Sequence, residues 1–187
     1  MSYQAYKDII LDMARTSIQN GLQHHKPITP DAKDTPDCLL DHVACFVTLE
    51  LNNQLRGCIG SLEAYRPLIT DIAHNAYAAA FNDPRFPPLS ATELPQLNIE
   101  VSILGAQQVM KFTNEADFLD QLQPGIDGLI LEDQGKRATF LPSVWESLPD
   151  KEDFLTHLKL KAGLPADHWS DNIVIYRYST EKISEHH

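Results

Sequence analysis

The sequence has few basic residues for its length. Fifteen Lys and Arg stand against 26 Asp and Glu, and the formal net charge is −11 with the histidines neutral. The basic residues are scattered singly or in pairs and form no patch. Nucleic-acid backbones and anionic membranes repel a protein of this charge at long range. We therefore expect neither a nucleic acid nor a membrane as partner, and a positively charged partner fits the charge better.

Cysteines and long apolar runs are also scarce. The three cysteines, Cys38, Cys45 and Cys58, are an odd number without close spacing, which argues against a disulfide framework and is typical of a reducing compartment. No apolar run approaches the ~20 residues that a membrane-spanning helix needs. The first seven residues lack the basic and apolar regions of a signal peptide, so we do not expect secretion. These absences predict a cytoplasmic protein.

Several cofactor motifs are missing too. The sequence contains neither the phosphate loop G-x-x-x-x-G-K-[ST] nor the dinucleotide fingerprint G-x-G-x-x-G. The eight histidines fit none of the zinc spacings, such as C-x-x-C or H-E-x-x-H. The three scattered cysteines cannot supply the iron–sulfur cluster of a radical enzyme. We expect no metal site, and the sequence identifies no cofactor.

The sequence does contain alternating strand and helix patterns. Its periodicity predicts helices over residues 3–22, 67–81, 113–122 and 150–162, and strands over 43–49, 54–59, 98–104, 128–132, 137–141 and 173–178. Residues 23–41 carry three prolines and predict a loop with little regular structure. Strands pair mainly through hairpins, and helices interrupt them irregularly. We therefore expect an α+β fold with mostly antiparallel sheets and packed helices.

The most informative stretch is Leu55-Arg56-Gly57-Cys58-Ile59-Gly60, the return strand of a hairpin that turns at Asn52-Asn53. Side chains of an extended strand alternate between faces, so Arg56 and Cys58 are expected on one face and Leu55 and Ile59 on the other. An arginine beside a thiol lowers the thiol pKa and favours the thiolate. Gly57 and Gly60 leave room for a ligand or for another backbone segment.

Cys58 is the candidate nucleophile, and nearby backbone amides would bind a developing oxyanion. The alternative is a small buried side chain that only packs, which is common for free cysteines. A nucleophile also needs a base. His74 is the obvious histidine, but it falls on the polar side of its predicted helix, and the spacing supports no Cys–His pair.

Arg56 and Arg85 are candidates for a clamp on a carboxylate or phosphate, because the planar fork of arginine binds either anion bidentately. In the alternative interpretation, Arg85 pairs with Asp83 or Glu100 and holds the loop over residues 82–89. Both roles are compatible.

Glu100 and Ser102 share one face of their strand and are expected to reach the same cleft. A half-buried glutamate acts as a general acid or base when burial raises its pKa. The alternative, which we favour, is that Glu100 is the structural partner of an arginine. The predicted site thus comprises Cys58 and Glu100 as catalytic residues and Arg56, Gly57, Gly60, Arg85 and Ser102 as substrate-binding residues.

Several segments together resemble the AMMECR domain family. They are Leu55-Arg56-Gly57-Cys58-Ile59-Gly60, Asp83-Pro84-Arg85-Phe86 followed by Glu93-Leu94, Ile99-Glu100-Val101-Ser102, Phe140-Leu141-Pro142 and Lys161-Ala162-Gly163-Leu164. Their order and spacing hold from about Tyr6 to Glu181. The sequence looks like the bacterial branch of the family, known as protein A of the AmmeMemoRadiSam system.

The resemblance implies one domain over residues 6–181, with the proline-rich loop 23–41 inside it and a tail over 182–187. It implies an α+β fold of two unequal lobes, with the cysteine motif near a cleft between them. It also implies an association with a Memo-like protein and a radical S-adenosylmethionine (SAM) enzyme, but it specifies no reaction. Leu160 stands where many relatives carry a cysteine, so we expect no mechanism that needs two family cysteines.

Three hypotheses about function follow. In the favoured one, the protein is a cytoplasmic enzyme or enzyme subunit that acts with the Memo-like protein and the radical SAM enzyme. Cys58 is then the nucleophile, and Arg56 and Arg85 bind an anionic small molecule. In the second hypothesis, it is a non-catalytic ligand-binding or scaffold protein whose cleft holds a ligand or a partner segment. In the third, it is an interaction protein whose glycines and cysteine serve only packing.

Overall fold

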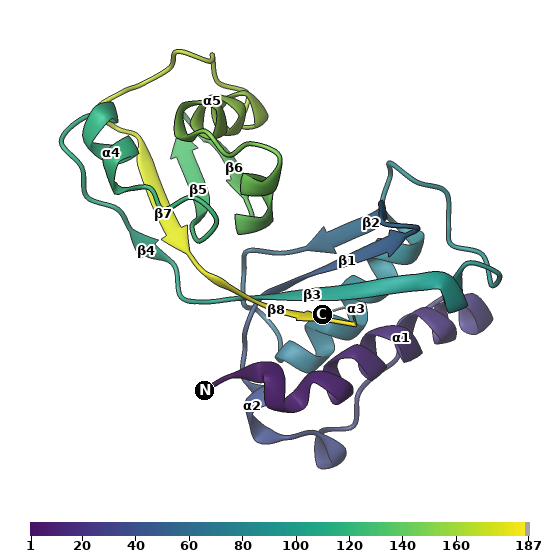
Figure 1. Ribbon diagram of the computed structural model, residues 1–187. Coiled ribbons are helices and arrows are strands. Elements are labelled where there is room, and N and C mark those ends of the chain that lie inside the picture. The colour runs from purple at the N-terminus through teal and green to yellow at the C-terminus, as the bar shows by residue number, and fades with distance from the viewer. Residues whose placement is uncertain (186–187) are drawn as a thin grey trace. The chain divides into compact units, whose positions relative to one another are not determined.

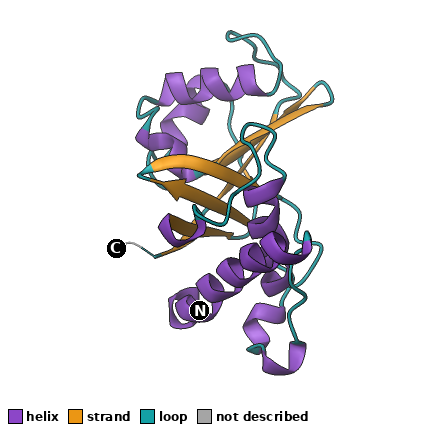
Figure 2. Ribbon diagram, turned by 90° about the vertical axis from the view of Figure 1, so that its right-hand side faces the viewer, coloured by secondary structure: helices purple, strands orange, loops and turns teal. Residues whose placement is uncertain are grey.

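The strand patterns of the sequence form two separate antiparallel sheets in the computed structural model, which describes residues 1–185 (Figure 1). Each sheet belongs to one of two units. Unit 1 comprises residues 1–104 together with the C-terminal segment from Glu181, and unit 2 comprises Gly105–Thr180. Helices, purple in Figure 2, pack on the strands of each unit. The predicted α+β class with antiparallel sheets and packed helices is confirmed.

Unit 1 contains a four-stranded sheet with the strand order β2-β1-β3-β8. Its strands are β1 (Cys45–Leu51), β2 (Gln54–Gly60), β3 (Leu97–Leu104) and β8 (Thr180–Ser184). Asn52 and Asn53 join β1 to β2 with φ angles of 53° and 62°. A two-residue hairpin turn of type I′ requires this left-handed backbone. The hairpin predicted from the Asn-Asn pair is therefore confirmed.

Two long helices, α1 (Lys7–His24) and α3 (Leu68–Phe81), pack on one face of this sheet, which we call the helix face (Figure 1). Side chains of a strand alternate, so every second strand residue contributes to the core beneath these helices. The core residues include Ile10, Ala14, Ile18, Ile69, Ile72, Ala76, Val47, Leu49, Ile99 and Val101. The remaining strand residues, Thr48, Cys58 and Glu100 among them, belong to the opposite face.

Short helical turns complete unit 1. They are η1 (Tyr3–Tyr6), η2 (Ala32–Asp34), α2 (Asp37–Leu40) and η3 (Leu94–Gln96). Two of them, η2 and α2, lie inside the proline-rich segment 23–41, so the predicted loop contains two short helical turns that the sequence did not indicate. Cys38 and Leu39 in α2 are buried in the core of unit 1, and this burial stabilises a helical turn too short to predict from periodicity.

The C-terminal residues 182–185 are also not a tail. Lys182 and Ile183 lie in β8, and Ile183 is fully buried. Glu185 accepts a hydrogen bond from the backbone N–H of Ile99 (3.0 Å) and forms an ion pair with Arg15 (2.7 Å). Ile183 belongs to the core of unit 1, and its burial together with the contacts of Glu185 holds this segment beside β3. The other part of the predicted tail, His186 and His187, lies outside the described residues.

Unit 2 is built around a four-stranded sheet with the order β4-β7-β5-β6. Its elements are β4 (Gln108–Val109), α4 (Glu115–Gln121), β5 (Gly128–Asp133), β6 (Lys136–Phe140), η4 (Pro142–Glu146), α5 (Lys151–Lys161) and β7 (Val174–Tyr178). In its core, Trp145 stacks on Phe154 with ring centroids 3.7 Å apart. The carboxylate of Asp150 caps α5 by accepting a hydrogen bond from the backbone N–H of Asp153. Within residues 1–185, no helix has both the length and the apolar character needed to cross a membrane.

Candidate functional site

The hairpin β1–β2 carries a β-bulge at Arg56. Leu49 pairs with Gly57 and Glu50 pairs with Leu55, so Arg56 is an extra residue without a partner on β1. The bulge interrupts the alternation of side chains. As a result Leu55 lies on the same face as Cys58, and the prediction that put them on opposite faces is wrong.

Arg56 is buried and binds the loop that precedes β3. Its Nε donates to the Glu93 carboxylate (2.8 Å), and its Nη2 donates to the carbonyl oxygen of Pro87 (2.8 Å). This guanidinium lowers the pKa of Glu93 to about 2. Only 10% of the Arg56 side chain is exposed, so its fork holds β2 to the loop and is not presented to a ligand. This finding argues against the predicted anion-binding role of Arg56.

The two glycines of the motif serve close packing. A Cβ on Gly57 would collide with the backbone carbonyl oxygen of Ala79 in α3. A Cβ on Gly60 would collide with the ring of Phe46 in β1. The sequence predicted that these glycines leave room for a ligand or for another segment. At both positions it is another segment of the chain that occupies this room.

Asp83 and Arg85 bind the backbone of Cys58 from the free edge of β2. The N–H of Cys58 donates to Oδ2 of Asp83 (3.0 Å), and Nη2 of Arg85 lies 3.5 Å from the carbonyl oxygen of Cys58. Arg85 donates to both carboxylate oxygens of Asp83, from Nε at 3.0 Å and from Nη2 at 2.7 Å. The two side chains thus take the place of a neighbouring strand at an exposed edge.

This pair settles one of the alternatives left open by the sequence. Arg85 pairs with Asp83 and not with Glu100, and mainly this guanidinium holds the pKa of Asp83 well below its usual range. The carboxylate of Asp83 is buried, whereas 55% of the Arg85 side chain is exposed. Of the two candidate arginines, Arg85 is therefore the one that a ligand can reach.

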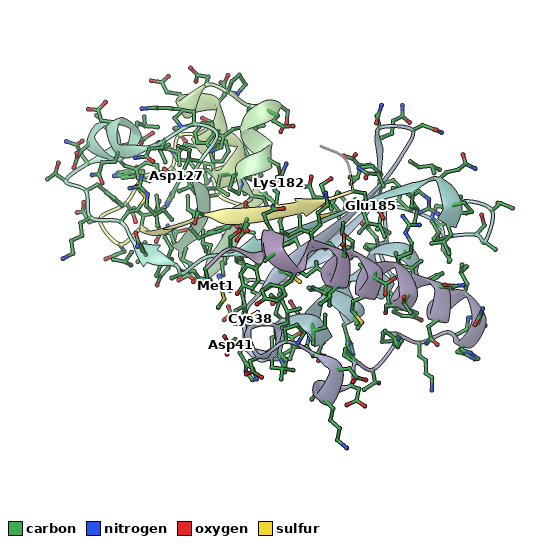
Figure 3. All side chains as sticks on the ribbon, turned by 60° about the horizontal axis from the view of Figure 1, so that its bottom comes forward. Met1, Cys38, Asp41, Asp127, Lys182 and Glu185 are labelled. Carbon is green, nitrogen blue, oxygen red and sulfur yellow. The ribbon has the colours of Figure 1, made fainter. Side chains whose placement is uncertain are left out.

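Cys58, Thr48, Glu100 and Lys182 form a row across the face opposite the helices. Thr48 of β1 pairs with Cys58 of β2 on one side and with Glu100 of β3 on the other. Its Oγ1 is hydrogen-bonded to the Cys58 sulfur at 3.3 Å. The Glu100 carboxylate lies 3.5 Å from Nζ of Lys182 on β8, which Figure 3 labels. The row places a thiol, a hydroxyl and a carboxylate on successive strands.

Sequence reasoning assigned no role to Thr48 or Lys182, and it expected an arginine rather than a lysine beside Glu100. Ser102 and Gly60 belong to the next row, on either side of Phe46. Within unit 1, Ser102 lies on the same face as Cys58 and Glu100. It is buried, so it contributes little exposed surface to that face. His74 is exposed on α3, as predicted, and α3 packs on the helix face of the sheet.

Burial raises the pKa of the Cys58 thiol above its ordinary value. The hydrogen bond from Thr48 and the positive charge of Arg85 oppose this rise, while the carboxylates of Asp83 and Glu100 add to it. The prediction of a lowered pKa is therefore wrong. The reason given for that prediction, a positive charge from Arg56, is wrong as well, because the cation that acts on the thiol is Arg85. Among residues 1–185, no three or more His, Cys, Asp or Glu side chains are grouped so that they could hold a metal ion.

Known proteins are similar to this one along nearly the whole chain. The model of the AMMECR1 family matches residues 11–183. A protein of Methanothermobacter thermautotrophicus is 37% identical over 183 residues, covering 94% of this chain and 92% of its own length. A protein of Thermotoga maritima is 35% identical over 167 residues, covering 88% of this chain and 91% of its own.

A solved structure is similar as well. The crystal structure of the uncharacterised protein PH0010 from Pyrococcus horikoshii matches with a TM-score of 0.91 at 33% sequence identity. The match covers 100% of this chain and 94% of that one. Sequence and fold lead to the same assignment, and the chain belongs to the AMMECR1 family.

Proposed function

We propose that the protein is an enzyme or enzyme subunit in which Cys58 is the nucleophile, Glu100 the base and Arg85 the group that binds an anionic substrate. One observation carries the proposal. It is the row that holds the Cys58 thiol against the Thr48 hydroxyl, with the Glu100 carboxylate on the next strand and an exposed arginine at the strand edge.

A protonated thiol is a poor nucleophile, so a cysteine whose pKa is raised needs a base when it reacts. In the proposed step, the Cys58 sulfur forms a bond to an electrophilic carbon, and its proton moves to Glu100 across the Thr48 hydroxyl. The leaving group departs with the electron pair of the bond that breaks. Thr48 favours the transfer because its hydroxyl both donates and accepts hydrogen bonds.

The remaining predicted site residues take supporting roles in this proposal. Arg85 replaces Arg56 as the anion-binding group, and Arg56 fixes the bulge through Glu93. Gly57 and Gly60 allow α3 and Phe46 to approach β2. Ser102 lies in the row next to Glu100 and is buried, so it supports the face that carries Cys58 and Glu100 rather than binding the substrate itself.

We further propose that the protein is a cytoplasmic member of the bacterial branch of its family, protein A of the AmmeMemoRadiSam system. In that setting it acts with a Memo-like protein and a radical SAM enzyme, which carries the iron–sulfur cluster. The motifs from Leu55 to Gly60 and from Lys161 to Leu164 support this placement through the resemblance described above.

The second candidate function is that of a non-catalytic ligand-binding or scaffold protein. The raised pKa of Cys58 favours it, because at neutral pH the sulfur is then a thiol that packs against Thr48. In this alternative Arg85 binds a ligand or a partner segment without covalent chemistry.

Alkylation of the three cysteines by iodoacetamide, followed by mass spectrometry across a range of pH, separates the two functions. If Cys58 is the nucleophile, it is expected to react in the folded protein with an apparent pKa above the ~8.5 of a free thiol. Glu100→Gln is expected to slow the reaction about threefold near neutral pH, because losing the base that takes the thiol proton outweighs losing a negative charge that opposes the thiolate.

Cys45 provides the internal control of this experiment. It is fully buried and hydrogen-bonded to Asp71, so its alkylation reports only unfolding. A Cys58 that stays as inert as Cys45 up to the pH at which the protein unfolds would rule out the nucleophile and leave the scaffold function. A reactive Cys58 whose rate is unchanged or raised in Glu100→Gln would remove Glu100 as the base.

Thr48→Val is expected to slow the alkylation of Cys58 about threefold to tenfold near pH 8. The valine keeps the size of the side chain but loses the hydroxyl that lowers the pKa of Cys58. Thr48→Ser is the matched control, since it restores the hydroxyl and should restore the rate. Equal rates in the valine and serine variants would show that the hydrogen bond has no influence on the thiolate.

A further inference from the structure

We infer that the ligand of this site is a small carboxylate whose electrophilic carbon lies one or two bonds from the carboxylate group. Its anionic end binds Arg85, and its reactive carbon meets the sulfur of Cys58. This inference rests on the proposed function and narrows it to a class of substrate.

The spacing between Arg85 and Cys58 sets the length of the ligand. Nη2 of Arg85 lies 3.5 Å from the carbonyl oxygen of Cys58, so the guanidinium lies beside the residue whose sulfur reacts. Covalent geometry keeps a cysteine sulfur within about 4.5 Å of its own carbonyl oxygen. The sulfur therefore lies at most about 8 Å from Nη2, and a hydrogen bond to the guanidinium, two covalent bonds and the approach of carbon to sulfur reach about 9 Å when fully extended, enough to cover this span. A short carboxylate fills this span, whereas a longer one would have to fold back on itself.

The bonding of Arg85 leaves one side of its fork for a ligand. Nε donates to Asp83, and Nη2 donates to Asp83 and to the carbonyl oxygen of Cys58, whereas Nη1 donates no hydrogen bond to any of the residues from 1 to 185. With 55% of the side chain exposed, the guanidinium is open to an incoming ligand. Asp83 also fixes the plane of the guanidinium, and such fixing lowers the entropy lost when an anion binds.

The charges around Cys58 favour a single negative charge on the ligand. Arg85 and Lys182 are positive, but Asp83 and Glu100 each offset one of these charges. A phosphate dianion would therefore be attracted by the free part of one arginine and repelled by two nearby carboxylates. A carboxylate needs only the arginine fork and brings half the charge to be compensated.

Two alkylating agents of nearly equal size test the inference, because iodoacetate carries the carboxylate and iodoacetamide does not. In both reactions the Cys58 sulfur bonds to the methylene carbon, iodide leaves with the electron pair of the C–I bond, and the thiol proton goes to Glu100 or solvent. The measured quantity is the ratio of the iodoacetate rate to the iodoacetamide rate at Cys58. Cys58 in the same chain unfolded in urea gives the reference ratio.

The folded protein is expected to show a ratio at least about fivefold above the reference. A net charge of −11 repels iodoacetate in general, so a ratio above the reference requires a local site. Arg85→Gln is expected to abolish the gain, and Arg85→Lys to retain part of it. Because both rates are measured on the same protein, a change in the exposure of Cys58 in either variant cancels in the ratio.

Lys182→Gln is the matched control, because it removes one positive charge from the same row and leaves the fork of Arg85 in place. If it abolishes the gain as Arg85→Gln does, the general field and not Arg85 attracts the anion, and the inference is wrong. A folded ratio at or below the reference overturns the inference alone, provided that Cys58 reacts with iodoacetamide. If Cys58 reacts with neither agent, the proposed nucleophile fails and the inference fails with it.

Discussion

Gly57→Ala is expected to destabilise the protein by about 3 kcal/mol or more. The added Cβ would collide with the backbone carbonyl oxygen of Ala79, which belongs to α3 and has no rotamer to adopt. Either β2 or α3 must move to relieve the contact, and α3 is fixed by its buried residues Ile69, Ile72 and Ala76. The free energy of unfolding in urea, followed by circular dichroism, measures the loss.

Gly125→Ala is the control for this substitution. Gly125 has a φ of +81°, but no atom lies within 4 Å of its Cβ position. Alanine there should cost only the strain of left-handed backbone, about 1 kcal/mol. If Gly57→Ala destabilises no more than Gly125→Ala, then α3 does not approach β2 as closely as the structure indicates.

Much of the fold was predictable because local signals agree with the final pairing. The Asn52-Asn53 pair adopts the left-handed backbone that its turn needs, and Asp150 caps α5 where the sequence indicates a helix start. The elements that were missed depend on contacts distant in sequence. β8 is held by Arg15 and Ile99 through Glu185, and the turn at Cys38 is held by burial against the core. Periodicity over four or five residues is too weak to reveal either.

The candidate site was predicted only in part, and the β-bulge is the reason. An uninterrupted hairpin from the Asn52-Asn53 turn would place Cys58 opposite Val47, a core residue of the helix face. The extra residue Arg56 moves Cys58 opposite Thr48 instead. Gly57 inside the strand is a signal for a bulge or for a close approach, but it does not show which of the two occurs or which residue is the extra one. The sequence therefore indicated the right segment but assigned Arg56, and not Arg85, as the cation that acts on the thiol.

The second large effect is expected at Asp83. Asp83→Asn should destabilise the protein by about 3 kcal/mol at neutral pH. The buried carboxylate accepts hydrogen bonds from the N–H of Cys58 and from the backbone and guanidinium of Arg85. An asparagine offers one acceptor oxygen, and its amide N–H groups would face these donors without a partner. Urea unfolding of the variant and of the wild type gives the difference.

This difference should depend on pH in a specific direction. The pKa of Asp83 in the folded protein lies below the 3.8 of an unperturbed aspartate, mainly because of Arg85. A lowered folded-state pKa stabilises the protein above the unfolded value and loses this contribution as the pH falls toward the folded value. The deficit of Asp83→Asn is therefore expected to be full near pH 7 and to shrink steadily below about pH 4. The pKa of Glu93 is also lowered, to about 2, so Glu93 contributes to stability with the same dependence on pH. Because Glu93 is present in both the variant and the wild type, its contribution cancels in the difference.

Asp12→Asn removes an exposed carboxylate from α1 and is the control, with an expected change within about 0.5 kcal/mol at either pH. If the deficit of Asp83→Asn were the same near pH 7 and near pH 3, the loss would come from shape alone and not from the charge that Asp83 shares with Arg85. If the deficit shrinks as expected, the edge of β2 is held by an ionised side-chain pair. In that case the backbone position of Cys58, on which both the nucleophile and its distance from Arg85 depend, is set by the charge of Asp83.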